Sequence, residues 1–98
     1  MEQTLAEWID NDMELEPGIT SYSVLHMFTW HDYFYLECIV EFTEDGVDYY
    51  VAVIDQQVGE CIENIYTTKE DLEKTLWEAF HKYNDIETDI IVSEMDEA

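Results

Sequence analysis

The sequence predicts an α+β domain, with a small antiparallel sheet of about four strands and an N-terminal and a C-terminal helix on one of its faces. Apolar residues recur at helical spacing near both ends of the chain and alternate with polar residues between them. The chain has 98 residues and is 47% hydrophobic, a length and composition typical of one folded domain. We therefore expect a single domain over residues 1–98, with residues 94–98 frayed.

The first helix is predicted over residues 4–15, where these apolar side chains recur at helical spacing: Leu5, Trp8, Ile9 and Met13. Pro17 and Gly18 end it. From Ser21 to Trp30 the pattern changes to alternation, which predicts the first strand. His31 and Asp32 are a turn into the second strand.

The second and third strands form a predicted hairpin between Tyr33 and Asp55. One face of its first strand is apolar: Phe34, Leu36, Cys38, Val40 and Phe42. Asp45-Gly46 is the pair that a two-residue type I′ turn prefers. That turn would place Phe42 opposite Tyr49, and Cys38 opposite Val53.

The opposite face of the same hairpin is mixed. The predicted register places Glu41 against Tyr50, and Glu37 against Ile54. Carboxylates therefore surround a small apolar and tyrosine centre. An ordinary solvated sheet face and a binding surface are both consistent with this pattern.

The C-terminal third begins with a shorter fourth strand over residues 60–66. Thr67 with Glu70, or Thr68 with Asp71, supplies a capping box for the second helix. This helix is predicted to end near Asn84 and to bury Leu72, Leu76, Ala79, Phe80 and Tyr83. Residues 90–92 fit either an edge strand or a short helix.

The charge of the chain bears most directly on function. The sequence has 25 acidic residues against three lysines and no arginine, which gives a net charge of −22. A net charge of magnitude about 2–8 is enough to keep a small domain soluble, so solubility alone does not explain a charge of −22. Direct binding of nucleic acid needs Lys and Arg to neutralise phosphates, and this chain has almost none. Anionic lipid headgroups would repel so acidic a surface. We expect a basic partner, one that itself handles nucleic acid.

Other classes of function find little support. No glycine-rich phosphate loop or arginine clamp is present, so we expect no enzyme and no cofactor. Residues 44–48 superficially resemble a calcium loop but lack its spaced ligands, and we expect no specific metal site. Cys38 and Cys61 lie in apolar runs and are predicted to be reduced and buried. With no signal peptide and no membrane-length apolar run, we expect a protein of the bacterial cytoplasm.

In size, acidity and its helix–sheet–helix order, the chain resembles small phage-encoded DNA mimics, particularly type II anti-CRISPR proteins. The resemblance covers general architecture along most of the chain. It implies an inhibitor that occupies the cleft in which a Cas nuclease or a similar enzyme would hold DNA. An immunity protein that neutralises a nuclease toxin is the first alternative. A regulatory module that dimerises through the mixed sheet face around Ile39, Ala52 and Ile54 is the second.

The candidate partner-binding residues fall into two groups. The first lies on and around the hairpin: Tyr33, Tyr35, Glu37, Glu41, Glu44, Asp45, Asp48 and Tyr50. The second lies at the end of the first helix: Asp10, Asp12, Glu14 and Glu16. In both groups carboxylates would take the place of phosphates against Arg and Lys of the partner.

Overall fold

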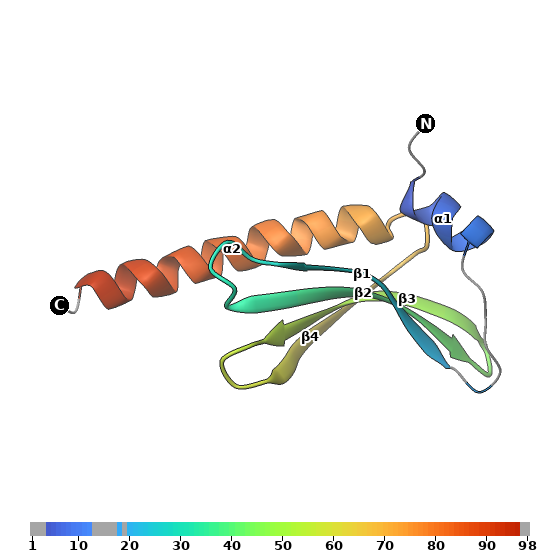
Figure 1. Ribbon diagram of the computed structural model, residues 1–98, viewed down its shortest axis with the longest axis horizontal. Coiled ribbons are helices and arrows are strands. Elements are labelled where there is room, and N and C mark those ends of the chain that lie inside the picture. Colours follow the sequence, from blue (N-terminus) through green and yellow to red (C-terminus); the bar gives the residue numbers. More distant parts are fainter. Residues whose placement is uncertain (1–3, 13–17, 19, 97–98) are drawn as a thin grey trace.

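The computed structural model describes residues 4–12, 18 and 20–96 (Figure 1). A short helix is followed by four strands and one long helix. The elements are α1 (Leu5–Asp12), β1 (Ser21–Phe28), β2 (Phe34–Thr43), β3 (Gly46–Asp55), β4 (Glu60–Thr67) and α2 (Leu72–Asp96).

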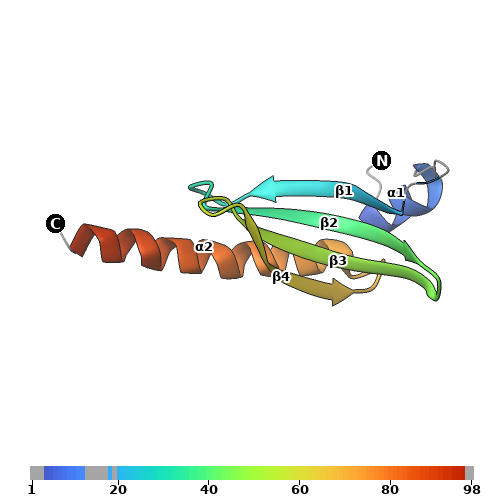
Figure 2. The ribbon, with the colours of Figure 1, turned by 90° about the horizontal axis from the view of Figure 1, so that it is seen from below.

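The described chain forms two layers. The four strands make one antiparallel sheet in the order β1-β2-β3-β4, so each strand pairs with its neighbour in sequence. Figures 1 and 2 show α2 lying along one face of this sheet, with α1 near the N-terminal end of α2. No helix of the described chain covers the other face, here called the outer face. The predicted α+β fold class is confirmed.

The core lies between the sheet and α2. Alternate residues of β2 are buried, as a strand with one covered face requires. The buried cluster consists of Ile9, Phe34, Leu36, Cys38, Val40, Val51, Val53, Leu72, Leu76, Ala79 and Tyr83. The predicted face assignment of the hairpin is therefore correct. Phe42 is only half-buried and packs at the edge of this cluster.

The predicted hairpin register is wrong by one pair. Thr43 pairs with Gly46, Phe42 with Val47 and Cys38 with Val51, so the two-residue loop is Glu44-Asp45. A type I′ turn at Asp45-Gly46 needs a positive φ at both residues, and Asp45 does not have one. Gly46 instead follows the loop, with φ 143°. Each partner moves by two residues, so the same side chains still face the core.

A β-bulge changes the faces of β1. Strict alternation from Ser21 to Trp30 would put Tyr22, Val24, His26 and Phe28 on one side of this strand. The pairing shifts between Ser23 and Leu25, so that Phe28 reaches the outer face opposite Tyr35. A bulge adds one residue to one strand and is not visible in the alternation itself.

The predicted end of the second helix is also wrong, because α2 continues past Asn84 to Asp96. Asn84 has no left-handed backbone conformation of the kind that ends helices. It is buried, and its Oδ1 accepts a hydrogen bond from the Trp30 backbone N–H at 3.0 Å. Residues 90–92 are helical, which decides between the two predicted alternatives, and residues 94–96 are helical as well.

Glu87 of α2 holds the β1–β2 turn. Glu87 is buried, with 1% of the residue exposed. It accepts hydrogen bonds from the Thr29 hydroxyl at 2.5 Å, the His31 N–H at 2.9 Å and the Tyr33 N–H at 3.0 Å. Buried carboxylates are stable only when such donors replace water. This single side chain therefore fixes the turn against the helix layer.

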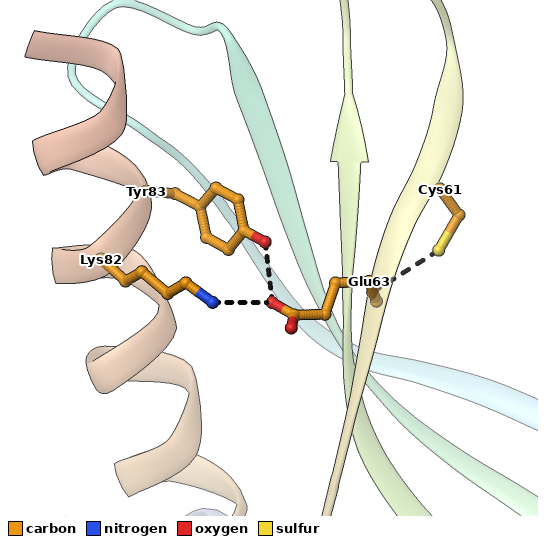
Figure 3. A network of polar contacts seen from close by, with 4 residues as sticks. All are labelled: Cys61, Glu63, Lys82 and Tyr83. Atoms are coloured by element: carbon orange, nitrogen blue, oxygen red, sulfur yellow. Dashed lines mark hydrogen bonds and ion pairs between the residues drawn. The ribbon is translucent and has the colours of Figure 1, made fainter. Parts of the chain in front are cut away.

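A second polar contact ties β4 to α2 (Figure 3). Glu63 Oε1 accepts a hydrogen bond from the Tyr83 hydroxyl at 2.7 Å and lies 3.3 Å from Lys82 Nζ. The Tyr83 hydrogen bond and the Lys82 charge lower the pKa of Glu63. Burial, followed by the hydrogen bond to Glu63, raises the pKa of Tyr83. The predicted burial of Cys61 is wrong, since this residue is exposed on edge strand β4, whereas Cys38 is buried as predicted. Both are free cysteines.

Both helices begin with a threonine cap. Thr4 and Glu7 form a reciprocal capping box at α1, in which each backbone N–H donates to the other residue's side chain at 3.2 Å. At α2 the Asp71 N–H donates to Thr68 Oγ1 at 3.2 Å. The second of the two predicted caps for this helix is thus the one formed.

Leu36→Ala should lower the free energy of unfolding by about 2–5 kcal/mol, because Leu36 is fully buried under α2. Urea denaturation followed by circular dichroism measures this loss. Val92→Ala, at an exposed position of α2, should change it by less than about 0.5 kcal/mol. Equal effects of the two substitutions would contradict the placement of the core.

Glu87→Gln should lower the free energy of unfolding by about 1.5–3 kcal/mol, since an amide NH₂ would face donors that now meet a carboxylate. The same urea titration measures the loss. Glu94→Gln, at an exposed site on the same helix, is the control and should be nearly neutral. A neutral Glu87→Gln would show that the carboxylate does not hold the turn.

Candidate protein-interaction surface

The outer face of the sheet is the candidate site because α2 leaves it uncovered. Its central positions are partly apolar, and Ala52 is buried among its neighbours. Register and strand alternation place these residues on it: Ser23, His26, Phe28, Tyr35, Glu37, Ile39, Glu41, Asp48, Tyr50, Ala52, Ile54, Asn64 and Tyr66. The face therefore combines carboxylates, aromatic rings and a small apolar centre.

Two carboxylates of β2 are fixed in place by tyrosines. The Tyr35 hydroxyl donates to Glu37 Oε1 at 2.8 Å, and the Tyr50 hydroxyl donates to Glu41 Oε2 at 2.9 Å. Ser23 Oγ also donates to Glu37 Oε1, at 3.1 Å. A carboxylate that is already oriented loses less conformational freedom when it binds a cation.

Glu41 and Asp48 lie directly opposite each other across β2 and β3. Directly opposed like charges destabilise an antiparallel pair. The register expected from the sequence had paired Glu41 with Tyr50, which would have avoided this repulsion. Glu44 and Asp45 follow in the adjoining loop and are exposed. The observed register thus concentrates negative charge at the β2–β3 end of the sheet.

Aromatic pairs stand on either side of the central apolar positions. The Tyr50 and Tyr66 ring centroids are 4.9 Å apart, and those of Phe28 and Tyr35 are 5.1 Å apart. Phe28 and Tyr66 are exposed despite their size. Large exposed rings on a face with little backbone freedom are the usual anchors of a protein interface.

The chain's lysines do not neutralise this face. Lys69 is 2.6 Å from Asp10, Lys74 is 4.0 Å from Glu78 and Lys82 is 3.3 Å from Glu63. Lys74 and Lys82 belong to α2, and Lys69 lies just before it. Because the sequence has only three lysines and no arginine, no lysine or arginine is left to pair with the carboxylates of the outer face, where His26 lies opposite Glu37.

The structure brings together only part of the predicted site. Tyr35, Glu37, Glu41, Asp48 and Tyr50 share the outer face, and Glu44 and Asp45 form the adjoining loop. Tyr33 precedes β2 and packs against the core instead. Asp10 lies on α1 and pairs with Lys69. The side chain of Asp12, and all of Glu14 and Glu16, lie outside the described residues.

The sequence analysis missed Phe28 and Tyr66, two aromatic residues of this surface, and it also missed the exposed Ile62 of β4. The bulge in β1 turns Phe28 outward, and a second bulge between Val53 and Ile54 leaves Ile62 exposed on β4. Neither bulge has a glycine or proline that would mark it. Tyr66 had a usable signal, because it lies in a predicted strand beside Tyr50.

The described part of the chain offers little support for a metal site, a nucleophilic cysteine or a membrane-spanning helix. Among its histidines, cysteines and acids there is no group of three or more placed to hold a metal ion. Burial raises the pKa of the Cys38 thiol to about 12, with the Glu73 charge adding to the shift. That thiol is poorly suited to act as a nucleophile. None of the described helices is long and apolar enough to span a membrane.

Comparison with known proteins adds nothing to these observations. The chain matches no protein-family model, no curated protein and no solved structure.

The phenols of Tyr35 and Tyr50 should ionise only near pH 12, because burial and the hydrogen bonds to Glu37 and Glu41 raise each pKa to about 12. An unfolded tyrosine has a pKa of about 10, so the folded state binds more protons between these values. The stability they contribute is complete below about pH 10 and is lost as the pH rises towards 12.

Ultraviolet absorbance titration of wild type and Tyr35→Phe isolates one of these phenols. The component missing from the variant should be the one that titrates near pH 12, and Glu37→Gln should lower its pKa. A missing component near pH 10 would contradict the Tyr35–Glu37 hydrogen bond.

Proposed function

We propose that the protein is an acidic inhibitor that mimics nucleic acid. In this proposal the outer face and the Glu44-Asp45 loop occupy the basic cleft of a nuclease or another nucleic-acid enzyme and exclude its DNA or RNA. The observation that carries the proposal is the uncompensated charge of the outer face, where Glu41 opposes Asp48 and every lysine of the chain is engaged elsewhere.

The charge distribution supports a protein partner with Arg and Lys at its surface. Such residues bind phosphates, and they bind carboxylates through the same charge-assisted hydrogen bonds. Hydrogen bonds from tyrosine hydroxyls orient the carboxylates of Glu37 and Glu41 before any partner binds. Long-range attraction between a domain of charge −22 and a basic cleft also speeds association.

The aromatic residues give the proposed interface an apolar component. Tyr50, Tyr66 and Phe28 lie between or beside the carboxylates and can be desolvated when the partner closes over the face. Burying them would slow dissociation, whereas the charges mainly affect the rate of association. The proposal requires neither catalysis nor a cofactor.

The resemblance to phage anti-defence proteins favours inhibition of a Cas nuclease in the cytoplasm of a bacterial host. An immunity protein against a nuclease toxin would use the same surface and the same chemistry. A dimeric regulatory module is disfavoured by the outer face itself, because two copies would bring Glu41 and Asp48 towards the same carboxylates of the partner.

Glu41→Gln with Asp48→Asn should weaken binding to the target and reduce its dependence on salt, because both substitutions remove charge from the outer face. The measurement is capture of nucleic-acid enzymes from bacterial lysate on the immobilised protein, followed by displacement with duplex DNA. Captured enzymes should be released by the DNA, and capture on the immobilised protein should weaken as the salt concentration rises.

The matched control is Glu73→Gln with Glu78→Gln, which removes the same charge from exposed positions of α2. It should leave capture close to that of wild type. Capture of an enzyme that stays bound while its DNA binds at full affinity would refute the mimicry. Equal loss in both double variants would show that the outer face is not the contact surface.

A further inference from the structure

The C-terminal part of α2 projects beyond the sheet. In Figures 1 and 2 the last turns of this helix extend past the ends of all four strands. Glu87 is the last buried residue of the helix up to Met95. Residues 88–95, here called the overhang, contain no buried side chain. Their helical conformation therefore receives little support from packing within this chain.

The residues of the overhang also favour a helical conformation only weakly. Ile90, Ile91 and Val92 are consecutive β-branched residues, which favour helix less than most other apolar residues do. Glu94 lies in the last turns, where negative charge opposes the helix dipole. An exposed helix of this composition gains most from a second element that covers its apolar side chains.

The stripe of α2 that packs on the sheet continues into the overhang. Leu72, Leu76, Ala79 and Tyr83 are buried, and the next residues at the same alternating spacing of three and four are Ile86 and Ile90. These two are 37% and 36% exposed. They line an open hollow together with Asp89, Ser93 and Glu94. The core-facing stripe thus runs on with no sheet beneath it.

The charges beside this stripe decide what can cover it. Asp89 and Glu94 line the hollow beside the two isoleucines. After Lys82 the chain has no lysine or arginine. In paired helices the charges next to the apolar seam select the partner, and like charges exclude it. A second copy of this chain would place acid against acid.

We propose that the Ile86–Ile90 hollow, at the start of the overhang, docks a basic amphipathic helix of another protein. Leucine- or isoleucine-like side chains of that helix pack on Ile86 and Ile90, and its flanking Lys or Arg residues meet Asp89 and Glu94. This inference goes beyond the proposed function, since the hollow belongs to the helix layer and the nucleic-acid mimicry to the outer sheet face.

The test uses a synthetic helical peptide of about three heptads, with leucine along its seam and lysine beside it. Fluorescence anisotropy measures its affinity for the full-length protein. Ile86→Gln with Ile90→Gln should weaken binding about tenfold or more. Asp89→Asn with Glu94→Gln should also weaken it, and should flatten its decline between about 0.1 M and 1 M salt.

The matched control is Val92→Gln with Met95→Gln, which makes the same polar change at exposed positions of the same segment outside the hollow. Its affinity should equal that of wild type, and circular dichroism at the assay temperature should show the wild-type helix content in every variant. Glu41→Gln with Asp48→Asn should likewise leave peptide affinity unchanged, which separates this site from the outer face.

Three results would overturn the proposal. The first is equal affinity of the Ile86/Ile90 and Val92/Met95 variants, which would mean that the peptide binds by charge alone. The second is equally tight binding of a peptide with glutamate in place of lysine. The third is a wild-type dimer in sedimentation that Ile86→Gln with Ile90→Gln converts to monomer, because a second copy would then be the occupant.

Discussion

A sheet has two faces, and in this protein a single long helix covers one of them. Leu72, Leu76 and Ala79 of α2 provide the apolar layer against which β2 and β3 bury alternate residues. Glu87 then locks the β1–β2 turn to the same helix through three hydrogen bonds. The other face of the sheet is left to solvent or to a partner, and both the charge distribution and the proposed binding surface follow from that asymmetry.

The distribution of charge follows the same division. All three lysines lie in or next to α2, where each has a carboxylate neighbour. The outer face has acids but no lysine or arginine. Tyrosines hold Glu37 and Glu41, and Glu41 lies directly opposite Asp48. Such an arrangement lowers stability in the isolated protein. Surfaces used for binding often keep features that the fold alone would not favour.

Much of this fold could be predicted from the sequence. Alternation identified the faces of β2 and β3, and helical spacing identified the face of α2, since both periods reflect one-sided burial. The predicted register of the hairpin was wrong because register depends on the φ of Asp45 and Gly46 and not on the apolar pattern. The predicted length of α2 was wrong because Asn84 and Glu87 bind backbone groups that lie more than fifty residues away in the sequence. The outward position of Phe28 was missed for a similar reason, because a bulge in β1 sets it.

The central claim is that the acids of the outer face serve a partner and not the fold. Asp48→Asn tests this most directly, because the Asp48 carboxylate makes no hydrogen bond or ion pair among the described residues and faces Glu41. Urea denaturation should show the variant to be more stable than wild type by about 0.2–1 kcal/mol. The difference should shrink as salt screens the repulsion. A less stable variant would contradict the account, since the carboxylate would then contribute to the fold.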